Sequence, residues 1–179
     1  MEKVLDFVRE RIKEKIKKTD ICLDATCGRG NDTLFLAKLS KKVYAFDVQK
    51  EAIDYSKNLL KEYDNIEFIN DTHENILDYI NENINIAMFN LGYLPKGDKT
   101  ITTKCSSTIA SVSKVIKKLE VNGIITIVCY PGHPEGFIES KELIEYLKNI
   151  NQKEYDIVRY DFINQINNPP FAIIIEKIK

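Results

Sequence analysis

The chain has 179 residues, of which 44% are hydrophobic and 30% are charged, and its formal net charge is −1. These values predict one globular domain over residues 1–179, and they exclude a disordered chain and a general binder of polyanions. The apolar runs fall well short of the roughly 20 residues that cross a membrane, and the start of the chain is too charged for a secretory signal, so we expect a cytoplasmic protein with no membrane partner.

Hydrophobic periodicity predicts helices and strands that alternate along the chain. Residues 3–18 carry apolar side chains at helical spacing and predict an amphipathic helix. The predicted strands are 21–24, 42–47, 66–70, 85–90, 124–130, 155–162 and 171–178. The other predicted helices are 31–40, 49–63, a short one from Asp71 or Thr72 to Ile80, 105–119 and 136–149. The last two strands have no helix between them, which predicts an α/β fold whose seven-stranded, mostly parallel sheet ends in an antiparallel hairpin.

A glycine-rich turn joins the first predicted strand to the helix that follows it. The strand ends in Asp24, and Gly28 and Gly30 follow before the helix begins. Glycines let backbone N–H groups approach a ligand, and a helix N-terminus beside them favours a cofactor with a nucleoside or an anion. The other polar residues that we expect to contact the cofactor from this turn are Thr26, Asn31 and Asp32.

The residue at position 33 helps to decide between two cofactors, NAD and S-adenosyl-L-methionine. The dinucleotide fingerprint has a third glycine where this chain has Thr33, and a β-branched side chain crowds the close contact between helix and strand that this glycine permits. The carboxylate at the strand end also suits a ligand with an amino group better than a pyrophosphate. We therefore expect S-adenosyl-L-methionine rather than NAD as the cofactor.

Two further strands also end in acidic residues. Asp47 closes the second predicted strand and is followed by Gln49, at the place where a ribose diol is held in doubly wound sheets. Asp71 closes the third, and His73 opens the short helix after it, so both are candidates for the adenine side of the cofactor. The pattern predicts a nucleoside-cofactor site built from the ends of three strands.

The loop after the fourth strand reads Asn-Leu-Gly-Tyr-Leu-Pro-Lys-Gly-Asp over residues 90–98. It resembles the Asn-Pro-Pro-Tyr loop of amino-group methyltransferases, with Leu91 and Gly92 in place of the two prolines. In those enzymes the Asn oxygen and a following carbonyl hold the N–H groups of the target, and the aromatic ring stacks on the base. The resemblance implies these roles for Asn90, Leu91 and Tyr93; a plain turn after a strand remains the alternative.

Histidine and lysine residues give two further hypotheses. His133 follows Tyr130 in the turn after the fifth predicted strand, 124–130. There it is placed to accept a proton or to contact a phosphate; the alternative is a solvated side chain without a function. Six lysines lie between Tyr93 and residue 118, against one acidic residue. This basic run either binds phosphates or forms a solvated face. The lysines of the run are Lys96, Lys99, Lys104, Lys114, Lys117 and Lys118.

The cysteines lack the spacing of metal ligands, so we expect no metal site and mostly buried, reduced thiols. A catalytic thiol is disfavoured because no histidine or acidic partner is evident. The cysteines are Cys22, Cys27, Cys105 and Cys129.

Four segments together resemble one family: residues 24–33, 46–49, 90–98 and 130–136. They are similar to the small, Rossmann-like class I methyltransferases known as putative rRNA methylases, the MnmM family. The resemblance implies methylation of the aminomethyl group of 5-aminomethyl-2-thiouridine at the tRNA wobble position. It also implies site residues: Asp24, Gly28, Gly30, Asp47 and Gln49 for S-adenosyl-L-methionine, Asn90, Gly92 and Tyr93 for methyl transfer, Tyr130 and His133 near the substrate, and Lys96, Lys99 and Lys104 on phosphates of the tRNA anticodon stem-loop.

Three alternatives stay open at this point. The first is a methyltransferase of the same fold that acts on another RNA or on a small amine. The second is an NAD-dependent oxidoreductase, which Thr33 disfavours, and the third is a nucleotide-binding module without catalysis. A homodimer is also left open.

Overall fold

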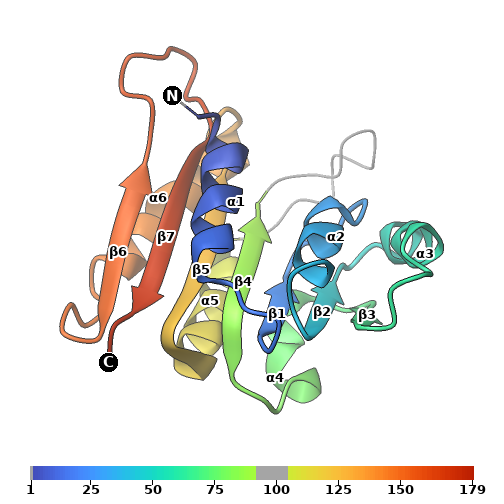
Figure 1. The fold of residues 1–179 in the computed structure, drawn as a ribbon. Coiled ribbons are helices and arrows are strands. Elements are labelled where there is room, and N and C mark those ends of the chain that lie inside the picture. Colours follow the sequence, from blue (N-terminus) through green and yellow to red (C-terminus); the bar gives the residue numbers. More distant parts are fainter. Residues whose placement is uncertain (1, 92–104) are drawn as a thin grey trace.

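The computed structural model describes residues 2–91 and 105–179 and shows a seven-stranded sheet with helices on both faces (Figure 1). The strands are β1 Ile21–Asp24, β2 Lys42–Phe46, β3 Ile66–Ile69, β4 Ile84–Asn90, β5 Leu119–Cys129, β6 Tyr155–Tyr160 and β7 Phe171–Lys177. The helices are α1 Val4–Lys15, α2 Asn31–Ala37, α3 Lys50–Leu59, the 3₁₀ turn η1 His73–Asn75, α4 Ile76–Tyr79, α5 Cys105–Lys118 and α6 Pro134–Leu147.

The sheet has the strand order β3-β2-β1-β4-β5-β7-β6. Strands β1 to β5 pair in parallel, and β7 runs antiparallel to both of its neighbours. The predicted Rossmann-like sheet with a terminal antiparallel hairpin is thereby confirmed. Parallel strands end at one edge, which we call the carboxyl edge. The β6–β7 loop, residues 161–170, lies at the same edge, because Cys129 pairs with Phe171 and Tyr160 with Ala172.

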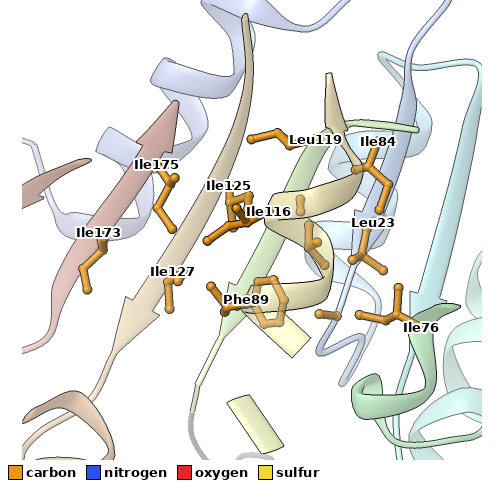
Figure 2. Packing of buried hydrophobic residues seen from close by; sticks show 14 of the residues in the cluster. Leu23, Ile76, Ile84, Phe89, Ile116, Leu119, Ile125, Ile127, Ile173 and Ile175 are labelled. Atoms are coloured by element: carbon orange, nitrogen blue, oxygen red, sulfur yellow. The ribbon is translucent and has the colours of Figure 1, made fainter. Parts of the chain in front are cut away.

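Each face of the sheet carries its own hydrophobic layer. On one face Leu23, Phe89 and Ile125 pack with residues of α4, α5 and α6 (Figure 2). On the other face α1 and α2 cover side chains of neighbouring strand positions such as Cys22 and Met88. Strands buried on both faces explain why the sequence shows near-continuous apolar runs. No helix in the part of the chain that the structure describes is both long and apolar enough to cross a membrane.

Strand β5 begins at Leu119, directly after α5, and the predicted start at residue 124 is wrong. Leu119 pairs with Ile84, and the register then shifts before Ile86 pairs with Ile124. A Cβ on Gly123 would lie 2.7 Å from the Asn85 carbonyl oxygen, so only glycine fits at this irregularity. The polar residues and the glycine of this bulge interrupt the apolar pattern, so periodicity alone predicts a loop where the strand begins.

Candidate functional site

The glycine turn after β1 is tied to the acidic residue after β2. The Gly28 N–H donates to Asp47 Oδ2 over 2.8 Å, and the Gln49 N–H donates to Asp47 Oδ1 over 2.9 Å. Gly28 and Gly30 have φ values of 52° and 76°, a region that side chains disfavour, and a Cβ on Gly30 would lie 3.0 Å from Ser56 Oγ. Partial burial raises the pKa of Asp47. The ends of β1 and β2 therefore form one continuous polar surface.

Asp24 is a buried carboxylate at the centre of this surface. Its side chain accepts hydrogen bonds from the Thr26 N–H over 3.1 Å and from the Thr33 hydroxyl over 2.6 Å. Burial, followed by the nearby charge of Asp32, raises the pKa of Asp24 to about 7. Thr33, which departs from the dinucleotide fingerprint, thus has a definite partner. A buried carboxylate at this place favours a ligand that carries a positive charge.

An ion pair that the sequence did not suggest links α1 to this surface. The Arg9 guanidinium donates to Asp32 Oδ1 over 2.8 Å and lies over the Phe35 ring. Asp32 is buried in the first turn of α2, whereas its neighbour Asn31 is exposed. Arg9 and Asp32 are far apart in sequence, and the apolar stripe of α1 indicated only a covering helix, so no local signal marked this pair.

The Asn90 amide lies where β4 reaches the same surface. Its backbone N–H donates to Thr26 Oγ1 over 2.8 Å, and its side-chain Nδ2 lies 3.5 Å from Asp32 Oδ2. The Tyr130 phenol also makes a hydrogen bond with the Asn90 side chain, and burial raises the pKa of Tyr130. The next residue, Leu91, is buried and donates its N–H to the Val128 carbonyl. Asn90 is therefore held by residues from β1, α2 and the end of β5.

His133 caps the helix that begins after Tyr130. Its Nδ1 accepts the Gly136 N–H over 3.1 Å at the N-terminus of α6. A Cβ on Gly136 would lie 2.2 Å from the Tyr130 carbonyl, so the turn requires glycine there. A protonated imidazole at a helix N-terminus loses this capping bond and opposes the helix dipole. The geometry thus gives His133 a structural task besides its predicted role as proton acceptor.

Asp71 and His73 occupy the end of β3 and the turn after it. The Asp71 carboxylate accepts hydrogen bonds from Asn75, Tyr79 and the Thr72 N–H, which hold its pKa below the usual range. His73 is buried and bonds to the Ala25 carbonyl, and burial lowers its pKa to about 4. A neutral His73 therefore braces the turn after β1, and its predicted contact with the cofactor stays a prediction.

Part of the predicted site lies outside the described residues, namely Gly92, Tyr93, Lys96, Lys99 and Lys104. Two other lysines of the basic run lie at different places in the fold. Lys118 ends α5 where β5 begins, at the opposite edge, and donates to the Asn81 carbonyl over 2.6 Å. Lys114 donates to the Glu74 carbonyl of η1, which follows the carboxyl end of β3.

Cysteine chemistry does not enter this site. Cys22, Cys27 and Cys129 are free and buried, and burial raises each thiol pKa to about 12. Within residues 2–91 and 105–179, no three His, Cys, Asp or Glu side chains are grouped to hold a metal ion.

Comparisons with known proteins agree with this geometry. The family model described as "Putative rRNA methylase" matches residues 43–176. An Arabidopsis thaliana protein, the chloroplastic tRNA (mnm(5)s(2)U34)-methyltransferase, is 30% identical over 92% of this chain, which spans 66% of its length. A "putative rRNA-methylase" structure from Clostridium thermocellum is 42% identical with a TM-score of 0.97, covering 99% of each chain. A "putative methyltransferase" from Streptococcus mutans in complex with SAH is 35% identical with a TM-score of 0.93, again covering 99% of each chain.

A doubly wound sheet with a glycine turn after β1, an acidic residue after β2 and an Asn at the end of β4, together with the family match and the similar structure in complex with SAH, marks this chain as an S-adenosylmethionine-dependent methyltransferase. This chain belongs to the "Putative rRNA methylase" family, because the family model matches most of its length. The predicted family, enzyme class and cofactor are confirmed, and the NAD-dependent oxidoreductase is excluded.

Asp24→Asn should remove a pH dependence of cofactor binding. Below pH 7 a growing fraction of Asp24 is protonated and cannot pair with a cation, so wild-type affinity for S-adenosylmethionine should rise by up to about tenfold per pH unit until pH 7 and then level off. Asp24→Asn should bind weakly at every pH, and the exposed Asp64→Asn should follow the wild type. Calorimetric titrations from pH 5.5 to 8.5 measure this; a flat wild-type profile would contradict the assignment.

Asp24 has the opposite pH dependence in its effect on the stability of the protein without cofactor. Since the pKa of Asp24 is higher in the folded than in the unfolded chain, its contribution to stability is fully present below about pH 4 and is lost as the pH rises through 7.

Arg9→Ala should weaken cofactor binding although Arg9 lies on a helix that covers the sheet. Without the guanidinium, the unpaired charge of Asp32 raises the pKa of Asp24 further, so less Asp24 is ionised at neutral pH to pair with the cofactor. We therefore expect the Kd for S-adenosylmethionine to rise roughly tenfold, as when the pKa of Asp24 rises by about one. Arg9→Lys should recover part of the affinity. The matched control is Arg11→Ala on the same helix, whose partner Glu14 is exposed; equal affinities for both alanine variants would refute the link.

His133→Ala and His133→Asn separate capping from proton transfer. Asparagine accepts the capping N–H, whereas alanine cannot, so we expect His133→Ala to lower the free energy of unfolding by about 1 kcal/mol and His133→Asn to leave it unchanged. Since the capping bond uses the acceptor nitrogen, His133→Asn should also keep most of its activity. Denaturant titrations and methyl-transfer rates measure the two effects. A stable but inactive His133→Asn would instead support the proton acceptor.

Proposed function

We propose that this protein methylates the aminomethyl nitrogen of 5-aminomethyl-2-thiouridine at the wobble position of tRNA. The family description concerns RNA methylation, and the Arabidopsis relative bears the name of a tRNA methyltransferase for this nucleoside. The proposal takes the chain as a single methyltransferase domain that works in the cytoplasm. It also includes the predicted contacts of Lys96, Lys99 and Lys104 with anticodon-stem phosphates.

The placement of the Asn90 amide is the observation that carries this proposal. Its backbone N–H is held by Thr26, and its side-chain Nδ2 faces Asp32 Oδ2 at 3.5 Å, so the amide nitrogen points toward a carboxylate. With Nδ2 directed at a carboxylate, the carbonyl oxygen is left to accept an N–H from the substrate. Accepting an N–H from an amine fixes the direction of the nitrogen lone pair, which is the requirement of an in-line displacement.

The residues beside Asn90 fit the cofactor. The buried Asp24 carboxylate suits the cationic amino-acid end of S-adenosylmethionine, and the oxygens of Asp47 keep lone pairs for ribose hydroxyls besides the two N–H groups that they already accept. The turn at Gly28 and Gly30 leaves backbone exposed where a side chain would obstruct it. When bound, S-adenosylmethionine supplies an electrophilic methyl group, which passes to the amine nitrogen while the electrons of the broken C–S bond stay on sulfur.

The acidic residues of the site also suit the substrate amine. An alkylamine is protonated at neutral pH, and a site with more carboxylates than cations favours its approach: Asp24, Asp32 and Asp47 stand against Arg9, which pairs with Asp32. The amine must lose a proton before it can accept a methyl group. Tyr130 is an unsuitable acceptor, because its raised pKa keeps the phenol protonated, and its hydrogen bond with Asn90 instead orients the amide. The predicted acceptor, His133, lies on the same edge of the sheet, but its Nδ1 already accepts the Gly136 N–H, so the activity of His133→Asn decides between capping and proton transfer.

The decisive experiment uses tRNA from cells that lack this gene and labelled S-adenosylmethionine, followed by mass spectrometry of nucleosides. We expect one added methyl group on 5-aminomethyl-2-thiouridine. Asn90→Ala should lower kcat by about a hundredfold, the cost of a misaligned nucleophile, while the Kd of the cofactor changes less than twofold. The control is Asn83→Ala, which removes an exposed amide bonded to Glu120.

Three other outcomes have distinct meanings. Methylation of a different nucleoside would keep the enzyme class and replace the substrate. Cofactor binding without a methylated tRNA nucleoside would favour a small amine. Unchanged activity of Asn90→Ala would remove this residue from the methyl-transfer site.

A further inference from the structure

A groove of about 690 Å³ lies between α6 and the β6–β7 loop. Its size is within the roughly 300–1,000 Å³ of pockets that hold small organic groups. Exposed apolar side chains line it: Phe137 is 51% exposed, Ile163 97% and Ile166 82%. None of the functions assigned above uses this groove.

The groove continues from the end of β5 along the carboxyl edge. Pro131, which follows Tyr130, is one of its lining residues. The turn after Tyr130 also touches the β6–β7 loop, since a Cβ on Gly132 would lie 3.7 Å from the Asn168 carbonyl oxygen and 3.8 Å from that of Asn167. A chain that places one unit beside Asn90 and Tyr130 can therefore extend its next unit into the groove.

The formal charges of the groove lining are balanced, with two cations, Lys141 and Arg159, and two acids, Glu145 and Asp161. Arg159 pairs with Asp161 over 2.6 Å, and Glu145 pairs with Lys148 over 2.7 Å. A surface with neutralised charges is poorly suited to phosphate groups, which need unpaired cations. The groove is thus suited to the uncharged part of a nucleotide, its base.

The remaining side chains provide the contacts that unpaired bases use. The Arg159 guanidinium lies 3.9 Å from the centre of the Phe171 ring and stays 48% exposed, so it presents an ordered planar surface. Phe137 adds an aromatic ring and Gln165, Asn167 and Asn168 add amides at the rim. Stacking on aromatic rings and guanidinium planes, with amide hydrogen bonds to base edges, is how proteins read single-stranded RNA.

We propose that this groove holds the base of a nucleotide adjacent to the methylated one in the single-stranded anticodon loop. The proposal rests on the function proposed above and adds a second RNA contact to it. A second copy of the chain is the competing occupant. It is disfavoured because the groove is a concavity of mixed polarity that reaches the turn after Tyr130 through Pro131, whereas a stable dimer needs a broad, self-complementary face of about 1,000 Å² or more.

The test compares stem-loop RNAs that are intact or abasic at either neighbour of the target. Phe137→Ala should raise the Kd of the intact RNA about tenfold, as for the loss of one stacked base, and Ile163→Ser should raise it by a smaller factor of about three, because an aliphatic side chain contributes only apolar contact; kcat and the Kd of the cofactor should be unchanged. For one abasic RNA the wild type and these variants should bind equally, because the contact is already lost. The matched control is Ile138→Ala, since Ile138 is 54% exposed on the same helix and does not line the groove.

Three other results would each overturn the groove proposal, and they separate its failure from that of the proposed function. If the wild type methylates the intact RNA and both variants bind it within twofold of the wild type, the groove proposal is overturned and the proposed function stands. If sedimentation shows a wild-type dimer that Ile163→Ser dissociates while RNA affinity is unchanged, the groove is an interface between copies. If the wild type neither binds nor methylates the intact RNA, the proposed function fails, and this occupant fails with it.

Discussion

The burial of Asp24 at the end of β1 is the constraint on which the site depends. A carboxylate without water needs hydrogen bonds, and Thr26 and Thr33 supply them. The second buried acid, Asp32, adds to this cost through its charge, and Arg9 offsets it by pairing with Asp32. The hydrophobic layers on both faces of the sheet hold these groups together, because each fully buried Leu, Ile or Phe contributes about 1.5–3 kcal/mol.

The two halves of the sheet meet at Asn90. The acids predicted to contact the cofactor lie at the end of β1 and just after β2 and β3, while Asn90 ends β4 and Tyr130 follows β5. Thr26 and Asp32 reach across from the first half and fix the amide. A change on either half therefore affects the other: loss of Asp32 would disturb both a predicted cofactor contact and the direction of the Asn90 carbonyl.

The sequence predicted what local patterns encode. Alternating apolar runs indicated the seven strands, and the acids at the ends of β1 and β2 marked a shared edge because parallel strands end together. Local patterns cannot show which distant residue approaches a buried charge, so the Arg9–Asp32 pair was missed. The irregular first residues of β5, which the sequence did not reveal as a strand, depend on pairing with β4. The capping bond of His133 depends on the backbone of α6. These features arise from tertiary packing, which overrides local propensity.

The position of β7 also means that α1 gains its full support late in synthesis. Although β7 follows β6 in sequence, it lies between β5 and β6. Helix α1 is made before β7, yet it packs against Ala172 and Ile174 of β7, and Lys15 pairs with Glu176. A ribosome-bound chain that has not yet released β7 would therefore hold every acid of the cofactor site while part of the surface that supports α1, the helix of Arg9, is still missing.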